Sequence, residues 1–303
     1  MERDVLVVGE SLVDIVNAAD GDIKEYAGGS AANVAVALAR LGRPVRFATS
    51  FAEDDHGRLI AEHLDDAGVR LAADPGAVSR TSTAVATIGV DGAADYEFDL
   101  EWRLNPVAEE PHPLVVHTCS LGAVLSPGAD DVFTLLERLR EFATVSYDVN
   151  ARPAITGTGP DLVDAVERMA GIADLVKASD EDLEALYPQL GTVKAARRLL
   201  SLGAEAVVVT RGGDGALWVG ADHVVEVDSH TVEVADTIGA GDTFGAALLD
   251  ALWEAGHLGA ERRKALAELD REQVEGVLFH ATRAAAVTVS RPGADPPYRH
   301  ELA

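Results

Sequence analysis

Residues 236–249 read Asp236-Thr237-Ile238-Gly239-Ala240-Gly241-Asp242-Thr243-Phe244-Gly245-Ala246-Ala247-Leu248-Leu249. A loop of small residues runs into an apolar helix, so the N–H groups of Gly239, Ala240 and Gly241 lie uncovered at a helix N-terminus. Such an end carries about half a positive charge and binds anions. Asp242 falls on the first turn, where a carboxylate can accept a proton. An anion cradle beside a base suits phosphoryl transfer; the alternative is a helix cap beside a tight turn.

Short apolar runs alternate with amphipathic stretches along most of the chain. The apolar runs predict strands at 5–8, 45–49, 115–121, 144–148, 175–178 and 206–210. The amphipathic stretches predict helices at 31–41, 59–67, 129–142, 161–172, 180–186, 193–202, 242–255 and 273–287. Buried strands alternating with helices indicate an α/β fold, in which a largely parallel sheet is covered on both faces.

Two segments interrupt this alternation. Residues 14–27 place a polar turn, Ala19-Asp20-Gly21-Asp22, between two short runs, and residues 83–100 place Asp91-Gly92 between two alternating runs. Asp-Gly between alternating runs is typical of a β-hairpin. The two segments form either a small antiparallel sheet that stands off the main body or two ordinary surface hairpins, and the pattern alone does not choose between them.

Composition excludes several classes of protein. The chain has 303 residues, 48% of them hydrophobic, which is enough for one large α/β domain. Its net charge of −26 argues against nucleic acid and anionic membranes as partners. The start of the chain reads as a strand rather than a signal peptide, and we find no apolar run of the roughly 18 residues that span a membrane. The single cysteine, Cys119, is expected to be a buried hydrophobe rather than a catalytic thiol, and a cytoplasmic location fits.

A family resemblance emerges from three motifs in the expected order. Residues 236–244 resemble the C-terminal signature of the ribokinase-like sugar kinases, the phosphofructokinase B-type family. The stretch Gly28-Gly29-Ser30-Ala31-Ala32-Asn33-Val34-Ala35 resembles the N-terminal signature of the family. Residues 209–216 resemble the strand and turn that lie on the nucleotide side of the family's site. The resemblance spans nearly the whole chain and implies a three-layer α/β/α ribokinase-like fold. It makes residues 1–303 a single kinase domain with a mostly parallel central sheet and a small β-sheet lid, formed by residues 14–27 and 83–103.

The resemblance also implies roles for particular residues. Asp242 matches the catalytic base, and Gly239, Ala240 and Gly241 match the anion hole. The positions that match sugar-binding residues are Asp14, Gly28, Gly29 and Asn33. The positions that match nucleotide-binding residues are Thr210, Gly212, Gly213 and Gly215. The implied substrates are ATP with Mg²⁺ and a sugar. By analogy with relatives, a homodimer that pairs through the lid is also expected.

Smaller features favour one branch of the family. Residues 148–153 resemble a segment typical of fructokinases and 2-keto-3-deoxygluconate kinases, in which Arg152 would reach the phosphate or the substrate. Ser179 and Asp182 replace the usual Asn and Glu of an element near Mg²⁺ and the nucleotide phosphates. The shorter Asp182 favours a water-mediated metal contact, and the alternative is a helix cap. Asp236 matches a residue of a monovalent cation site, so K⁺ dependence is a further hypothesis.

Two other classes of protein fit the sequence less well than a sugar kinase does. A Rossmann-type dehydrogenase would need Gly-x-Gly-x-x-Gly after the first strand, and the chain has Gly9-Glu10-Ser11-Leu12-Val13-Asp14 there. A sugar or nucleotide sensor on the same fold would not need the intact Gly-Ala-Gly-Asp. The sequence favours a fructokinase, with 2-keto-3-deoxygluconate kinase, ribokinase or nucleoside kinase as alternatives. Tyr96, Phe98 and Trp102 are expected to pack the lid, or else to cover the sugar.

Overall fold

The main sheet forms the centre of the molecule. The computed structural model describes residues 3–18, 22–88 and 94–302, and within them this sheet has nine strands in the order β13-β12-β11-β10-β9-β8-β1-β4-β5. The strands are β1 (Val5–Val8), β4 (Val45–Ala48), β5 (Arg70–Leu71), β8 (Val115–Cys119), β9 (Thr144–Asp148), β10 (Leu175–Ser179), β11 (Ala206–Thr210), β12 (Ala216–Val219) and β13 (Val224–Val227).

The seven neighbouring strands β11, β10, β9, β8, β1, β4 and β5 run parallel. The remaining two strands, β12 and β13, pair antiparallel at the other edge of the sheet. This confirms the prediction of a mostly parallel sheet. The strands β1, β8 and β9 are buried at every position, which explains why they read as continuous apolar runs instead of alternating ones.

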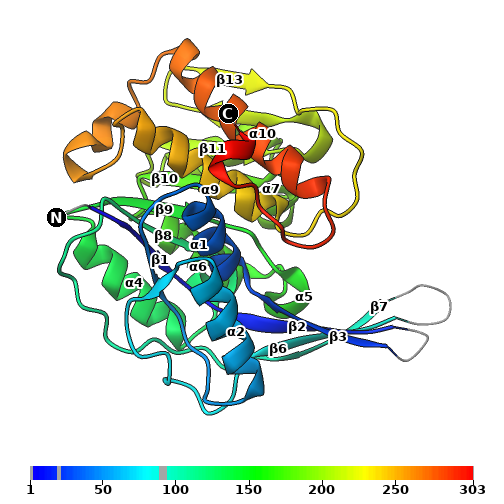
Figure 1. The fold of residues 1–303 in the computed structure, drawn as a ribbon. Coiled ribbons are helices and arrows are strands. Elements are labelled where there is room, and N and C mark those ends of the chain that lie inside the picture. The colour runs from blue at the N-terminus through cyan, green and yellow to red at the C-terminus, as the bar shows by residue number, and fades with distance from the viewer. Residues whose placement is uncertain (1–2, 19–21, 89–93, 303) are drawn as a thin grey trace.

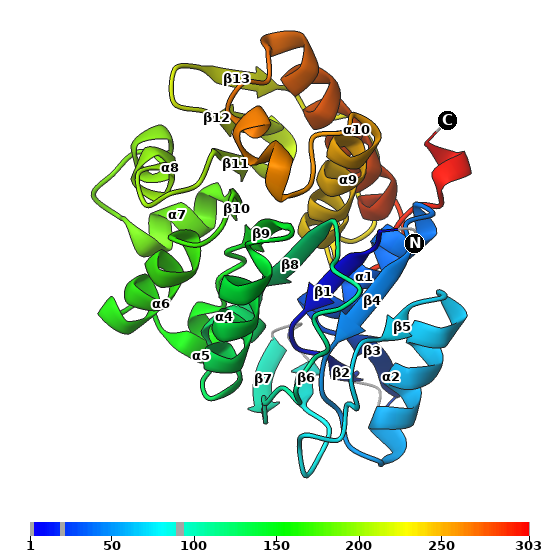
Figure 2. The ribbon, with the colours of Figure 1, turned by 90° about the vertical axis from the view of Figure 1, so that its left-hand side faces the viewer.

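Helices cover both faces of the sheet, as Figure 2 shows. The core on one face joins α1 (Ser30–Arg40), α2 (Asp55–Asp66), α9 (Ala240–Glu254) and α10 (Arg271–Val289). The core on the other face joins α4 (Gly128–Leu139), α6 (Pro160–Ala170), α7 (Asp180–Leu186) and α8 (Thr192–Leu200). The three-layer α/β/α arrangement predicted from the sequence is therefore confirmed.

A second sheet of four strands projects from the body (Figure 1), in the order β3-β2-β6-β7. Its strands are β2 (Leu12–Asn17), β3 (Ile23–Gly28), β6 (Thr83–Ile88) and β7 (Ala94–Asp99). The two hairpins therefore form one lid sheet. The expectation that it would be antiparallel throughout is wrong, because β2 and β6 pair in parallel. Both strands leave the body side by side and run outward as the first strands of their hairpins. Most of the turn Ala19-Asp20-Gly21-Asp22 and all of Asp91-Gly92 lie outside the described residues.

Two local predictions need correction. The strand expected at 115–121 ends at Cys119, and a short helix α3 (Ser120–Val124) follows it. An apolar run of this length fits a buried strand and a buried helix equally well. Trp102 is not part of the lid: it is 4% exposed in the body core, where its Nε1 donates to the carbonyl oxygen of Gly122. Further short elements are α5 (Pro153–Thr156), η1 (Gly212–Asp214), η2 (Ala260–Leu266) and η3 (Arg299–Glu301).

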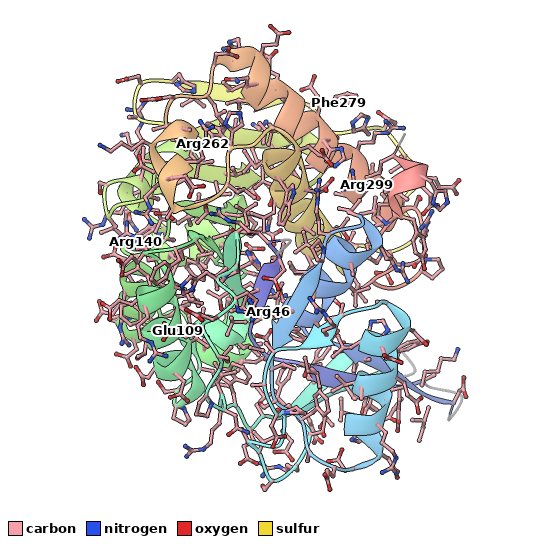
Figure 3. All side chains as sticks on the ribbon, turned by 60° about the vertical axis from the view of Figure 1, so that its left-hand side comes forward. Arg46, Glu109, Arg140, Arg262, Phe279 and Arg299 are labelled. Carbon is pink, nitrogen blue, oxygen red and sulfur yellow. The ribbon has the colours of Figure 1, made fainter. Side chains whose placement is uncertain are left out.

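A buried carboxylate ties the C-terminal segment to the body. Asp250 of α9 is 1% exposed and accepts hydrogen bonds from Arg43, His280 and Arg299, at 2.6, 3.0 and 2.7 Å. Figure 3 labels Arg299, which reaches this carboxylate from η3. These partners hold the pKa of Asp250 below its usual value, although burial opposes the charged form. Among the described helices, none combines the length and apolar character that a membrane span requires.

Candidate active site

The carboxyl edge of the main sheet gathers most of the predicted site residues. Asp148 ends β9, and Ser179 and Thr210 are paired at the ends of β10 and β11. The first turn of α9, with Asp242, lies at the same edge, because the side chain of Asp242 bonds to the loop that follows β9. In open parallel sheets the ligand site lies at this edge. The sequence motifs are therefore brought to the part of the fold where a substrate is expected.

The loop before α9 has the form predicted for an anion cradle. Gly239 is the N-cap in the left-handed conformation, with φ of 73°, and a Cβ there would come within 2.7 Å of the Ala294 Cβ. Only glycine fits this position. Among the described residues, the N–H groups of Gly239 and Gly241 have no hydrogen-bond partner, whereas Ala240 donates over 3.3 Å to the Thr237 carbonyl. Two of the three predicted amides are thus free to receive an anion.

Asp242 is held by side chains from distant parts of the chain. It is 6% exposed. Ser30 Oγ donates to its Oδ1 over 2.6 Å, and Asn33 Nδ2 donates to its Oδ2 over 2.8 Å. These contacts fix the carboxylate, and Oδ2 keeps a lone pair for a further donor. Asn33 lies against the predicted base in this structure, and its role in binding a sugar stays a prediction.

Asn150 completes this arrangement and was missed by the sequence analysis. Its Nδ2 donates to Ser30 Oγ over 2.8 Å and lies 3.4 Å from Asp242 Oδ1. Its φ of +37° is in the left-handed region, which asparagine tolerates better than most residues. Arg152, predicted to reach the substrate, is exposed and donates from Nη1 to Asn150 Oδ1 over 2.6 Å. The pattern around residue 150 was recognised, but nothing in it assigns a role to the asparagine.

Two carboxyl groups stand where the lid meets the body. Asp14 of β2 is half-buried, and burial raises its pKa to about 6 against the opposing charge of Arg152. Glu10 is 6% exposed, and burial raises its pKa to about 7, although it accepts the Gly122 N–H over 2.7 Å. The sequence analysis missed Glu10, because a single Glu after a strand has no distinguishing pattern. The positive charge of Arg152 lowers the pKa of both groups.

Gly28 and Gly29 leave space that other atoms of the protein occupy, namely the Asp14 side chain and the Glu10 backbone. A Cβ on Gly28 would come within 2.2 Å of Asp14 Oδ2. Gly29 has φ of 98°, and a Cβ there would come within 2.9 Å of the carbonyl oxygen of Glu10. The two glycines therefore permit the contacts that place Asp14 and begin α1. Their predicted role in approaching a sugar remains a prediction.

The predicted nucleotide side lies at the antiparallel edge of the sheet. Thr210 ends β11 and is partly exposed, and η1 follows it as a tight turn. Gly212 and Gly215 take left-handed φ values of 51° and 85°, and a Cβ on Gly215 would come within 2.0 Å of the Val227 carbonyl. No atom stands within 4 Å of a Cβ built on Gly213. This turn exposes backbone on its open side, as a nucleotide site requires.

Ser179 and Asp182 form the helix cap that was the alternative to metal binding. Ser179 Oγ accepts the Asp182 N–H, and Asp182 Oδ2 accepts the Ser179 N–H over 2.7 Å, which is a capping box. Asp182 Oδ1 also accepts the Ala151 N–H over 2.8 Å, so it positions the loop beside Asn150. Among the described residues no group of three His, Cys, Asp or Glu could hold a metal. A Mg²⁺ ion carried by phosphates and waters needs no such group.

Asp236 is bound in a similar way. Its Oδ1 accepts the Ile238 N–H over 3.0 Å, and its Oδ2 accepts the Gly293 N–H over 2.9 Å. These contacts join the loop before α9 to the C-terminal tail. They explain why an aspartate suits this position without any ion, and the K⁺ hypothesis stays a prediction.

Cys119 is fully buried beside this site. Its Sγ lies 3.2 Å from Ser30 Oγ, whose hydroxyl proton is donated to Asp242. Burial raises the pKa of the thiol well above its usual value, and the charges of Glu10 and Asp242 act in the same direction. A thiol held in its protonated form is a poor nucleophile, so the expectation of a buried hydrophobe fits the structure.

Comparisons with known proteins agree with this geometry. A fructokinase of Rhizobium leguminosarum bv. trifolii is 34% identical over 260 residues, which cover 82% of this chain and 79% of the relative. The fold is similar to a structure of fructokinase with bound ATP from Xylella fastidiosa, with a TM-score of 0.86, 25% identity, and coverage of 100% of this chain and 98% of the other. A structure of fructokinase from Vibrio cholerae O395 in fructose, ADP and calcium ion bound form gives a TM-score of 0.76, 27% identity, and coverage of 96% and 94%.

The family assignment rests on a match along the chain. The model of the family described as pfkB family carbohydrate kinase matches residues 2–301. Both signatures found in the sequence lie within this match, and the structure places their residues, Asn33 and Asp242, in direct contact. The chain therefore belongs to the pfkB family of carbohydrate kinases.

Proposed function

We propose that this carbohydrate kinase transfers the γ-phosphoryl group of ATP to a hydroxyl of a neutral sugar, with fructose as the first candidate. The observation that carries the proposal is the position of Asp242, buried on the first turn of α9 beside two unbonded amides. Asp242 accepts the proton of the sugar hydroxyl as that oxygen attacks phosphorus. The N–H groups of Gly239 and Gly241 bind the oxygens of the transferring group.

The other residues of the site hold the reactants in place. Asn33 and Ser30 keep the carboxylate of Asp242 oriented, so that little reorganisation is needed when the sugar binds. Asp14 accepts hydrogen bonds from sugar hydroxyls. The turn of η1 and the ends of β10 and β11 receive the nucleotide. Mg²⁺ bound to the ATP phosphates would supply neutralisation of their charge, and closure of the lid sheet excludes water from the reaction.

The charges near Asp14 favour a neutral sugar. Arg152 is the cation whose field reaches both Asp14 and Glu10, so its positive charge is already offset by Asp14 and by the ionised fraction of Glu10. A sugar acid, such as 2-keto-3-deoxygluconate, or a sugar phosphate would bring further negative charge to this place. The fructokinases reported above support fructose among the neutral sugars.

We also propose that the lid sheet pairs with a second copy of the chain. Tyr26, Tyr96 and Phe98 are 53%, 58% and 38% exposed, and the rings of Tyr96 and Phe98 are stacked 6.1 Å apart. The strand register places all three on the same face of the sheet as Asp14. They do not form a core within the lid, which was the favoured expectation from the sequence. Exposed aromatic side chains on one face are typical of an interface.

The first experiment measures ADP release with Mg²⁺-ATP over a panel of acceptors. The panel contains fructose, ribose, 2-keto-3-deoxygluconate, fructose phosphates and adenosine. We expect fructose to give the highest kcat/KM. A higher value with the acid or the phosphates would contradict the argument from charge, and a higher value with adenosine would indicate a nucleoside kinase.

Asp242→Asn tests the base on the best substrate of that panel. The amide keeps the size of the side chain but cannot take a proton. We expect kcat to fall by at least about 10³-fold while the affinity for ATP, measured by calorimetry, stays within about threefold. Turnover close to that of the unchanged protein would show that Asp242 is not the base.

A further inference from the structure

An ion pair lies inside the protein beneath α9. Lys177 of β10 is 6% exposed and Asp148 of β9 is 1% exposed, and Lys177 Nζ donates to Asp148 Oδ2 over 2.7 Å. Burial opposes the charged ammonium, but Asp148, Asp182 and Asp242 outweigh it and raise the pKa of Lys177. Burial raises the pKa of Asp148 to about 6 against the effect of Lys177, so both groups are charged at neutral pH. A buried ion pair is seldom more stable than apolar side chains of the same volume. Its presence beside the site therefore suggests a role other than stability.

Two glycines of α9 open the helix toward this lysine. Gly241 and Gly245 are four residues apart and therefore share one face of the helix. A Cβ on Gly245 would come within 3.7 Å of Lys177 Cδ, and a Cβ on Gly241 would come within 3.5 Å of Lys177 Nζ. The aliphatic stem of Lys177 thus runs along α9 toward its N-terminus, and the ammonium stands beneath the first turn.

The ammonium has bonding capacity left over. Nζ carries three donors, and among the described residues it has one hydrogen-bond partner, Asp148. The charged or titratable groups that face it are Asp148 from β9, Asp182 from α7, Asp242 from α9 and His117 from β8. Burial lowers the pKa of His117 to about 3, and Lys177 acts in the same direction, so His117 is neutral. Lys177 is therefore the charged cation of this cluster.

We propose that Lys177 is a positioning residue for phosphoryl transfer, held by Asp148 so that its charge strengthens anion binding at the amides of Gly239 and Gly241. The inference rests on the anion cradle of the proposed function. A fixed charge in a water-free site acts strongly on charge that develops nearby, and it needs no rearrangement during the reaction. Lys177 forms no bond to the transferring group and keeps its protons throughout. The competing interpretation is that the pair only fills the space left by Gly241 and Gly245.

The double variant Lys177→Met/Asp148→Asn separates these interpretations. It removes both charges with little change of volume, and such replacements of buried ion pairs are usually tolerated. We expect kcat to fall at least tenfold while the KM for the sugar stays within twofold. The affinity for ADP with tetrafluoroaluminate, which mimics the transferring group, should fall at least five times more than the affinity for ADP alone. An unchanged kcat with an unchanged ratio of the two affinities would overturn the proposal, even if the melting temperature fell.

Arg46→Met/Asp4→Asn is the matched control. Arg46 Nε donates to Asp4 Oδ2 over 2.5 Å, and Asp4 is 4% exposed. Asp4 immediately precedes β1, so this pair lies at the opposite edge of the sheet from Asp242 (Arg46 is labelled in Figure 3). The control loses a comparable buried pair and should keep kcat within twofold. An equal loss of kcat in both double variants would mean that any buried pair matters to the fold, and would overturn the proposal.

Asp148→Asn alone gives a second measurement that does not depend on the double variant. It preserves the shape of the side chain but no longer stabilises the charge of Lys177, so the ammonium loses its proton more easily. We expect a new fall of kcat as the pH rises from 7 to 10, absent from the unchanged protein. Superimposable pH profiles would overturn the proposal. Asp242 is present in all these variants, so their failure leaves the base assignment standing, whereas only Asp242→Asn tests that assignment.

Discussion

Among single residues, Glu10 gives a test through stability instead of activity. Burial raises its pKa from 4.5 to about 7 in the folded protein. The folded state therefore favours the protonated form. Glu10 contributes most to stability below pH 4.5, and this contribution is lost as the pH rises through 7. The difference between the two pKa values corresponds to a contribution of Glu10 to the free energy of unfolding on the order of 3 kcal/mol. Urea unfolding at pH 4.5 and pH 8 should show Glu10→Gln gaining stability relative to the unchanged protein as the pH rises.

The control for this experiment is Glu184→Gln, which changes an exposed glutamate on α7. Its stability relative to the unchanged protein should vary little over the same range. If Glu10→Gln behaves like this control, burial does not raise the pKa of Glu10, and the carboxylate is then fully charged beside Arg152 at neutral pH.

At the same level of detail, the sequence predicted the residues of the motifs but not their contacts. Asp242 and Asn33 were both named, yet their hydrogen bond joins positions 209 residues apart. Ser30 and Asn150 lie inside the quoted motifs and were not assigned, because a serine or an asparagine has many uses. Their role appears only when the fold brings them within 2.8 Å of one another.

At the level of secondary-structure elements, the start of α9 contains two glycines that should respond differently to substitution by alanine. Gly239→Ala forces a left-handed φ on alanine and a Cβ within 2.7 Å of Ala294, so we expect a loss of stability of about 1–2 kcal/mol and a kcat lowered at least tenfold. Gly241→Ala has an ordinary contact at 3.5 Å and gains helix propensity, so its stability should stay equal or rise by up to about 1 kcal/mol. Thermal unfolding and kcat of the two variants check this. A stable, active Gly239→Ala protein would contradict the strained geometry.

Element boundaries were predictable where buried strands end at polar residues. The strands at Thr144–Asp148 and Ala206–Thr210 and the helix Asp180–Leu186 appear with the predicted limits. The strand at β8 was drawn two residues too long, because the apolar run continues into α3. The parallel pairing of β2 with β6 had no local signal, since hairpin turns specify only the strands that they connect.

For the molecule as a whole, the lid predicts how copies of the chain associate. If the face with Tyr26, Tyr96 and Phe98 pairs with a second copy, sedimentation should give twice the 31.8 kDa mass of one chain. The double variant Tyr96→Ser/Phe98→Ser should raise the dissociation constant at least tenfold, because it removes exposed apolar area from that face. Phe279→Ser, an exposed change on α10, is the control and should not alter the mass. An unchanged protein that sediments as a single chain at all concentrations would contradict the proposal.

The hydrogen bonds around Asp242 have a consequence for chains cut in two. Ser30, Asn33 and Asn150 precede the exposed turn at Ala221 and Asp222, and Asp242 follows it. A protein divided at that turn would keep the proposed sugar-binding groups in one fragment and the proposed base in the other. Neither fragment could turn over a sugar alone, because the carboxylate would have lost all of these partners. Catalysis recovered on mixing would then count reassembled molecules directly, which makes the division point a natural place to build a reporter of association.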